Sequence, residues 1–176
     1  MLAAATAAVL PAQNIPRYAN NLAPYVPSAP RVVDRMLELA NLKPGETLYD
    51  LGCGDGRIVI AAAENYKAKA VGVEISEKLV RVATNRVKKL GLQNQVKIIH
   101  GDLMNVDLSG ADVVTLYLLT LSNEELRPRL EKYLKPGARV VSHDYAVPGW
   151  RPNNIDKADE HPGHLIYVYI MPAEKK

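Results

Sequence analysis

Three glycines follow an acidic residue at the end of a short apolar run: Gly52, Gly54 and Gly56 follow Asp50. Glycine permits a tight turn and close approach of the backbone to a ligand, and the first N–H groups of a following helix are free to bind that ligand. The dinucleotide fingerprint G-x-G-x-x-G would need glycine where Arg57 stands. The loop therefore predicts a ligand-binding turn from a strand into a helix, with NAD the weaker candidate.

Two further acids end apolar runs downstream of this loop. Glu74 closes the run 70–73, and Asp102 follows the run 96–100. An acid at the end of the second strand can accept hydrogen bonds from both hydroxyls of a ribose. Taken singly, the glycines could merely close a turn and the acids could merely cap helices. Together, at successive strand ends, they favour a site for a nucleoside-bearing ligand.

This combination resembles the class I, seven-strand methyltransferases that depend on S-adenosylmethionine. The resemblance implies that Asp50 and the glycine loop hold the methionine part of the cofactor. It also implies that Glu74 binds the ribose and that Asp102 binds the adenine amino group. The cofactor-binding residues expected on this basis are Tyr25, Asp50, Gly52, Gly54, Gly56, Glu74, Asp102 and Leu103.

A closer resemblance covers about residues 24–172. It is carried by the sequences YVPS at 25–28, DLGCGDGRIV at 50–59, LLT at 118–120, RVVSH at 139–143 and GW at 149–150. These segments are similar to the archaeal protein-lysine methyltransferase and to its mitochondrial relatives, which act on the ATP-synthase c-subunit and the adenine nucleotide translocase. The resemblance implies methyl transfer to lysine ε-amines of a protein substrate with exposed lysines. The N-terminal arm is unrelated and no membrane segment is recognisable, so the membrane substrates of those relatives are not carried over.

A lysine acceptor makes one chemical demand, because its amine must lose a proton before it attacks. An apolar aromatic channel lowers the amine pKa by desolvation, and aromatic faces still accept the cationic product. The candidate channel residues are Tyr25, Tyr117, Tyr145 and Trp150, each of which could equally be a core or rim aromatic. No residue stands out as a general base.

Two other functions stay open: a methyltransferase for small molecules or RNA, and a cofactor-binding module without catalysis. Enzymes that methylate nucleobase amines carry an Asn/Asp-Pro-Pro-aromatic motif after the fourth strand, and residues 117–122 lack one. A chain of 176 residues makes one domain and leaves no room for a separate substrate domain. The net charge of +3 is small and scattered, so no nucleic-acid partner is expected.

The sequence gives little reason to expect a metal or a disulfide. Cys53 is the single cysteine and is expected as a small filler beside the cofactor. His161 and His164 flank a Pro-Gly pair, which favours a hairpin turn over a metal pair.

The first 21 residues differ in character from the rest. We expect residues 1–21 to form a disordered or loosely docked arm and 22–176 to form the methyltransferase domain. The apolar run near the start lacks a positive n-region, and no run reaches transmembrane length. A cytoplasmic monomer without a membrane partner is therefore expected, with export disfavoured.

The order of apolar runs and turns predicts a Rossmann-like, doubly wound α/β fold. Its mostly parallel seven-stranded sheet should carry an antiparallel C-terminal edge hairpin, with helices on both faces. Expected helices run from a Ser28 cap to about Asn41, from Arg57 to about Asn65, from a Ser76 cap to Gly91, and from Glu124 to Leu134, kinked or split at Pro128. Expected strands end at Leu51, Glu74, His100, Leu116, His143 and Ile170.

Overall fold

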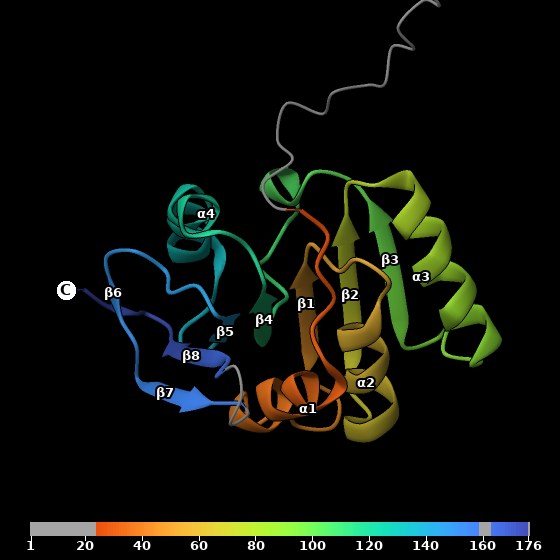
Figure 1. The fold of residues 1–176 in the computed structure, drawn as a ribbon, viewed down its shortest axis with the longest axis horizontal. Helices are drawn as coiled ribbons and strands as arrows, with labels where there is room; N and C mark the ends of the chain where they lie inside the picture. The colour runs from red at the N-terminus through yellow and green to blue at the C-terminus, as the bar shows by residue number, and fades with distance from the viewer. Residues whose placement is uncertain (1–23, 159–162, 176) are drawn as a thin grey trace, which may run out of the picture.

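The computed structural model describes residues 24–158 and 163–175. Five parallel strands form the centre of the sheet: β1 (Thr47–Leu51), β2 (Lys69–Glu74), β3 (Val96–His100), β4 (Val113–Leu116) and β5 (Arg139–His143). Two antiparallel strands, β7 (Asn154–Lys157) and β8 (Leu165–Ile170), extend it beyond β5. The order across the sheet is β3-β2-β1-β4-β5-β8-β7 (Figure 1). The predicted fold class is confirmed, including the C-terminal hairpin.

The parallel register brings the carboxyl ends of the central strands to one edge of the sheet. Asp50 of β1 lies opposite Gly72 of β2 and Thr115 of β4, and Glu74 of β2 lies opposite His100 of β3. Chain order reverses between β1 and β4, which makes this edge the topological switch point where ligands of such sheets bind. The fold therefore gathers the predicted acids at one place.

Apolar side chains alternate between the two faces of the sheet and form two cores. One core is covered by helices α1 (Pro30–Leu39), α2 (Arg57–Tyr66) and α3 (Glu77–Lys89) and includes Leu48, Val113 and Val141 of the strands. The other lies under α4 (Thr120–Tyr133) and the short 3-10 helix η1 (Leu103–Asn105), and includes Val114, Leu116 and Val140. Helices thus cover both faces, as predicted.

Two predicted helix starts are wrong. Helix α1 begins at Pro30 after an Ala29 N-cap, because the Ser28 hydroxyl is used elsewhere, in a 3.0 Å hydrogen bond to Nδ1 of His143. Helix α4 begins at Thr120 instead of Glu124, and it runs through Pro128 without being split. By contrast, α3 has the predicted cap, since Ser76 Oγ accepts from Leu79 N–H at 3.5 Å.

Other features lie beyond the predictions or outside the described residues. A two-stranded sheet of β6 (Trp150–Arg151) and β9 (Glu174–Lys175) was not predicted. The proposed arm at 1–21 and His161 fall outside the part of the chain that the structure describes. Among the described helices, none has both the length and the apolar character needed to cross a membrane.

Candidate active site

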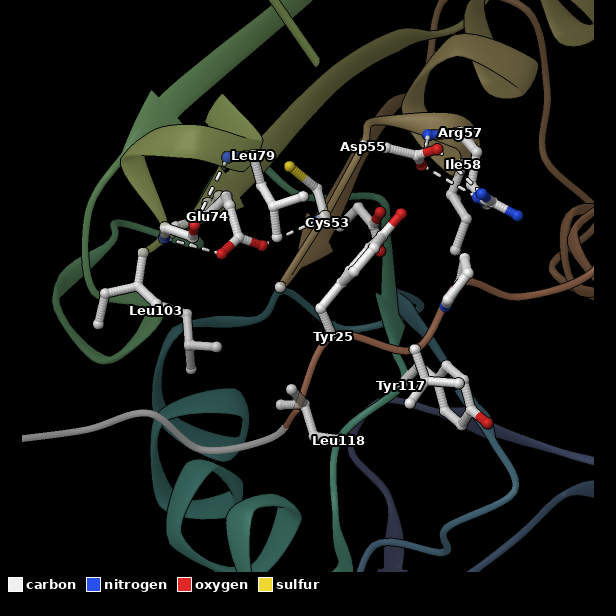
Figure 2. A pocket seen from close by; sticks show the side chains of 18 of the residues that line it. Tyr25, Cys53, Asp55, Arg57, Ile58, Glu74, Leu79, Leu103, Tyr117 and Leu118 are labelled. Atoms are coloured by element: carbon white, nitrogen blue, oxygen red, sulfur yellow. Dashed lines mark hydrogen bonds and ion pairs between the residues drawn. The ribbon is translucent and has the colours of Figure 1, made fainter. Parts of the chain in front are cut away.

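A cavity of about 300 Å³ opens at the carboxyl ends of β1, β2 and β4. Most of the predicted site residues line it together: Tyr25, Asp50, Gly52, Gly54, Glu74, Asp102, Leu103 and Tyr117. Figure 2 shows Glu74 and Leu103 on one side, Tyr117 on the other, and the ring of Tyr25 between them. The segment 24–28, which precedes α1, forms part of the wall.

The glycine loop takes a backbone conformation that other residues rarely adopt. Gly52 has a φ of 85° and Gly54 a φ of 53°, both in the left-handed region. Glu74 fixes this loop from the neighbouring strand, since its Oε2 accepts the N–H of Gly54 at 2.9 Å. The other oxygen, Oε1, accepts the N–H of Ser76 at 2.8 Å. Each oxygen keeps a further lone pair that a ligand hydroxyl can use.

Asp50 is a buried carboxyl at the floor of the cavity, with 3% of its surface exposed. Its Oδ1 accepts a hydrogen bond from the hydroxyl of Thr115 at 2.8 Å. Burial is the main influence on the group and raises the pKa of Asp50 to about 7, although the Thr115 bond acts in the opposite direction. A positively charged ligand group beside Asp50 would favour its ionised form.

Asp102 lies at the end of β3 with Leu103 next to it, and both line the cavity. The Oδ1 of Asp102 accepts the N–H of Met104 at 2.8 Å and so caps the first turn of η1. Leu103 is 9% exposed and belongs to the core under α4. Asp102 therefore combines the structural role of a helix cap with a position from which it can reach a ligand.

Tyr25 lies over the glycine loop. A Cβ atom added at Gly54 would be 2.5 Å from Cε2 of Tyr25, so the ring packs where only glycine leaves room. The Tyr25 side of the wall is held by Arg57, which donates to the carbonyl oxygen of Ser28 at 2.5 Å and is oriented by two bonds to Asp55. Close packing against glycine and this anchor explain the position of Tyr25.

Tyr117 forms the opposite part of the wall at the end of β4. Its hydroxyl donates toward Oδ2 of Asp144 at 3.3 Å, and its ring lies 3.9 Å from the ring of His143, centroid to centroid. Burial raises the pKa of Tyr117, so its hydroxyl stays protonated at neutral pH. Tyr145 stacks behind it at 6.3 Å between ring centroids and does not line the cavity.

Two predicted site residues have other roles. Trp150 is 1% exposed, packs against Tyr169 and donates from Nε1 to Glu131 at 2.8 Å, so it belongs to the core and not to the cavity wall. Gly56 is the N-cap of α2 and faces α3, where an added Cβ would lie 3.1 Å from Cβ of Ala83. The expectation of a lysine-channel role for Trp150 and of cofactor contact for Gly56 is thus corrected.

Cys53 fills space beside the cavity, as expected. It is 4% exposed, and its Sγ would lie 2.7 Å from a Cβ placed at Gly72. Burial raises the pKa of its thiol, which keeps it neutral. Sequence reasoning missed Thr115 and the Arg57–Asp55 pair. Thr115 had a usable signal, since it is the one hydroxyl in the apolar run of β4.

The residues present fit the cofactor that the resemblance implies. Carboxyl groups stand at three strand ends for the charged and hydroxyl-bearing parts of the ligand, and apolar side chains of Leu79, Leu103 and Leu118 line the space between them. The left-handed glycines bring the backbone to the cavity without side chains.

The family model of the ANTKMT methyltransferase domain matches residues 50–154. The chain is 46% identical over 154 residues to a protein-lysine N-methyltransferase of Saccharolobus islandicus (strain REY15A), covering 86% of this chain and 96% of that protein. It is 36% identical to the adenine nucleotide translocase lysine N-methyltransferase of Mus musculus, over 73% of this chain and 56% of that protein. It is 31% identical to the ATP synthase c-subunit lysine N-methyltransferase of Homo sapiens, over 75% and 56%.

A solved structure is similar over nearly its whole length. The crystal structure of an RNA methyltransferase from Salinibacter ruber in complex with S-adenosyl-L-homocysteine superposes with a TM-score of 0.81 at 45% identity, covering 86% of this chain and 97% of that chain. S-adenosyl-L-homocysteine is the product that remains when S-adenosylmethionine has given up its methyl group. These findings confirm the resemblance drawn from the sequence. The chain belongs to the ANTKMT methyltransferase family and is an S-adenosylmethionine-dependent methyltransferase.

Proposed function

We propose that this enzyme transfers methyl groups to the ε-amine of lysine side chains in other proteins. The observation that carries the proposal is the match to the Saccharolobus islandicus protein-lysine N-methyltransferase over 96% of that protein's length. The mouse and human relatives, whose names also specify lysine methylation, support the same acceptor.

The cavity has features that suit such an acceptor. S-adenosylmethionine supplies a methyl group on a sulfonium, which a neutral amine can attack in line. The protein must align that amine, exclude water and favour its deprotonated form. The rings of Tyr25 and Tyr117 at the cavity provide an apolar, aromatic approach that disfavours the charged amine and still tolerates a methylated cation.

The surface beside the cavity supports a protein acceptor. Tyr25 and Val26 line the cavity and are 49% and 53% exposed, and Leu119 and Leu121 follow Leu118 with 41% and 77% exposure. Exposed apolar side chains grouped in this way suit contact with another protein segment. A nucleic-acid backbone would instead call for clustered basic side chains.

A second candidate function is RNA methylation, because the Salinibacter ruber structure at 45% identity is named an RNA methyltransferase. Residues 117–120 carry Tyr-Leu-Leu-Thr and so lack the Asn/Asp-Pro-Pro-aromatic motif of enzymes that methylate nucleobase amines. We therefore place lysine first and RNA second.

The deciding experiment supplies the protein with isotope-labelled S-adenosylmethionine and a cell lysate, then separates protein, RNA and small molecules. We expect the label in protein, as 14-dalton additions that mass spectrometry maps to lysines. Label only in RNA would favour the second function, and label only in metabolites a small-molecule enzyme. Cofactor binding with no labelled fraction would favour a non-catalytic module. A catalytically impaired Tyr25→Ala variant, added to the same lysate, controls for endogenous enzymes.

The pH dependence of the reaction gives an independent check. Because only the neutral amine attacks, turnover at limiting protein substrate should rise with pH toward the free lysine pKa of about 10.4. The rise should level earlier if the aromatic approach lowers the pKa of the bound amine.

We also propose that the enzyme works as a cytoplasmic monomer without a membrane or nucleic-acid partner. S-adenosylmethionine is a cytosolic metabolite, and the net charge of +3 is low for a polyanion-binding protein. Analytical ultracentrifugation and fractionation of cells test the two parts of this proposal separately.

A further inference from the structure

Two histidines and an aspartate converge behind the Tyr117 wall of the cavity. His143 and Asp144 stand at the end of β5, and His164 stands just before β8. The Nδ1 of His164 lies 3.1 Å from Nε2 of His143 and 2.9 Å from Oδ2 of Asp144, and the Asp144 oxygen lies 3.4 Å from the His143 nitrogen. The three ligand atoms thus form a compact triangle.

Hydrogen bonds alone cannot satisfy all three contacts. The carboxylate oxygen carries no proton, and each of the two ring nitrogens carries at most one. At most two of the three short contacts can therefore be hydrogen bonds, and the third brings like groups together. A cation that receives a lone pair from each atom makes all three neighbours favourable at once.

The spacing and the type of the three atoms match a transition-metal ion. Zinc binds nitrogen at about 2.0–2.1 Å, which sets two ligands of a tetrahedral ion about 3.3 Å apart. The observed separations of 2.9, 3.1 and 3.4 Å are close to this value. Two imidazoles and one carboxylate form a donor set typical of Zn²⁺ sites that keep a fourth position open.

The groups around the triangle orient its members as outer partners of a metal site do. The Nδ1 of His143 bonds to Ser28 Oγ at 3.0 Å, and in the tautomer that donates this proton the lone pair of Nε2 faces the triangle. The second oxygen of Asp144, Oδ1, accepts the N–H of Leu165 at 3.1 Å. Tyr117 donates toward Oδ2 of Asp144 at 3.3 Å, which a metal-bound carboxylate can also accept.

We propose that His143, Asp144 and His164 form a binding site for a divalent transition-metal ion with the ligand preference of Zn²⁺. The ion ties the end of β5 to the start of β8, and so fixes the C-terminal hairpin against the wall that carries Tyr117. The site is separate from the cofactor cavity, because none of its three ligands lines that cavity.

The test uses the full-length protein after treatment with a chelator and removal of that chelator. Titration with Co²⁺ is followed by the visible absorption of the ion, and titration with Zn²⁺ by calorimetry. We expect one ion per chain, the absorption of a low-coordinate cobalt site with nitrogen ligands, and a melting temperature that rises with added Zn²⁺.

Two variants locate the ion, and one variant serves as a matched control. His164→Ala removes a part-exposed ligand, and Asp144→Asn removes the charge but suits the left-handed φ of 59° at this position. Each should weaken Zn²⁺ binding at least tenfold while keeping the circular dichroism of the parent. His100→Ala, at the end of β3 near the opposite edge of the sheet, should bind as the parent does.

Three outcomes would overturn the proposal. The parent could show no saturable binding of one ion per chain. Both His164→Ala and Asp144→Asn could bind Zn²⁺ as tightly as the parent. His100→Ala could lose as much affinity as they do, which would assign the ion to another part of the surface. None of these readouts depends on methyl transfer, so the site stands or falls apart from the acceptor.

Discussion

The carboxylate of Glu74 accepts the backbone N–H of Gly54 at 2.9 Å, so the end of β2 holds the loop that follows β1. The same carboxylate accepts the N–H of Ser76 at 2.8 Å, just before α3. Glu74 therefore sets the shape of the cavity through hydrogen bonds within the protein itself. A loop that is already ordered does not have to lose conformational freedom when the cofactor binds.

Glu74→Ala should weaken S-adenosylmethionine binding by about 2–4 kcal/mol, because ribose hydroxyls and two backbone N–H groups lose a charged acceptor. Isothermal calorimetry measures the change. Glu74→Gln is the matched control, since its amide keeps one oxygen and should lose less. Unchanged affinity in Glu74→Ala, or tighter binding of NAD than of S-adenosylmethionine by the parent, would contradict the assignment.

Asp102→Ala should weaken cofactor binding less than Glu74→Ala does. The adenine amino group is expected to make one polar contact with Asp102, while Leu103 continues to pack against the ring. Asp102→Asn keeps an oxygen that can cap η1, and it separates the loss of this cap from the loss of the ligand contact. Equal losses for the alanine variants of Asp102 and Glu74 would show that the division of roles is wrong.

Cofactor affinity should rise with pH up to about 7 and then level off. Burial raises the pKa of Asp50 to about 7, and the methionine part of the cofactor, which the resemblance places beside it, carries positive charge that favours the ionised carboxylate. Calorimetry over a pH series tests this. The profile should flatten in Asp50→Asn, and a parent profile that is flat or falling across this range argues against the role.

The same pKa shift should have the opposite effect on the stability of the protein without cofactor. The folded state keeps the Asp50 proton to higher pH than the unfolded chain does. Its contribution to stability is therefore complete below the unfolded-state pKa of about 3.9 and is lost as the pH rises to about 7. In urea unfolding, Asp50→Asn should gain stability relative to the parent over this range. A difference that stays constant with pH would rule the effect out.

Trp150 and Tyr117 should respond differently to truncation. Trp150→Ala removes a core ring and leaves Glu131 without its indole partner, so it should lower the free energy of unfolding by about 3–5 kcal/mol. Tyr117→Ala changes a cavity wall, so it should mainly reduce methylation at limiting protein substrate. Urea unfolding and initial rates are measured for both. A Trp150→Ala protein with parental stability and lost activity would restore the channel role.

The sequence was most informative where local patterns decide the structure. Strand ends at Leu51, Glu74 and His143 follow from apolar runs closed by turn residues, and the glycine loop between β1 and α2 has the expected left-handed backbone. The acids meet at one edge because parallel strands share their direction. These features depend on neighbours in sequence or on the general geometry of a parallel sheet.

The failures all involve partners that are far apart in the chain. Ser28 had the features of a helix cap, but its hydroxyl bonds to His143. The exposed fraction of Trp150 depends on packing against Tyr169 and Glu131, which no local pattern reveals. His164 joins His143 and Asp144 only because β8 pairs with β5. Side-chain pairing across the sheet was therefore beyond the sequence argument.

The bond between Ser28 and His143 joins residues 115 positions apart. Ser28 belongs to the wall of the cavity, and β5, which carries His143, is made late during synthesis on the ribosome. A nascent chain that stops before β5 already contains the glycine loop and all three acids at the strand ends, yet its Ser28 side chain has no anchor. The enzyme should therefore acquire its cofactor late in translation, when the growing chain has supplied the second half of the wall.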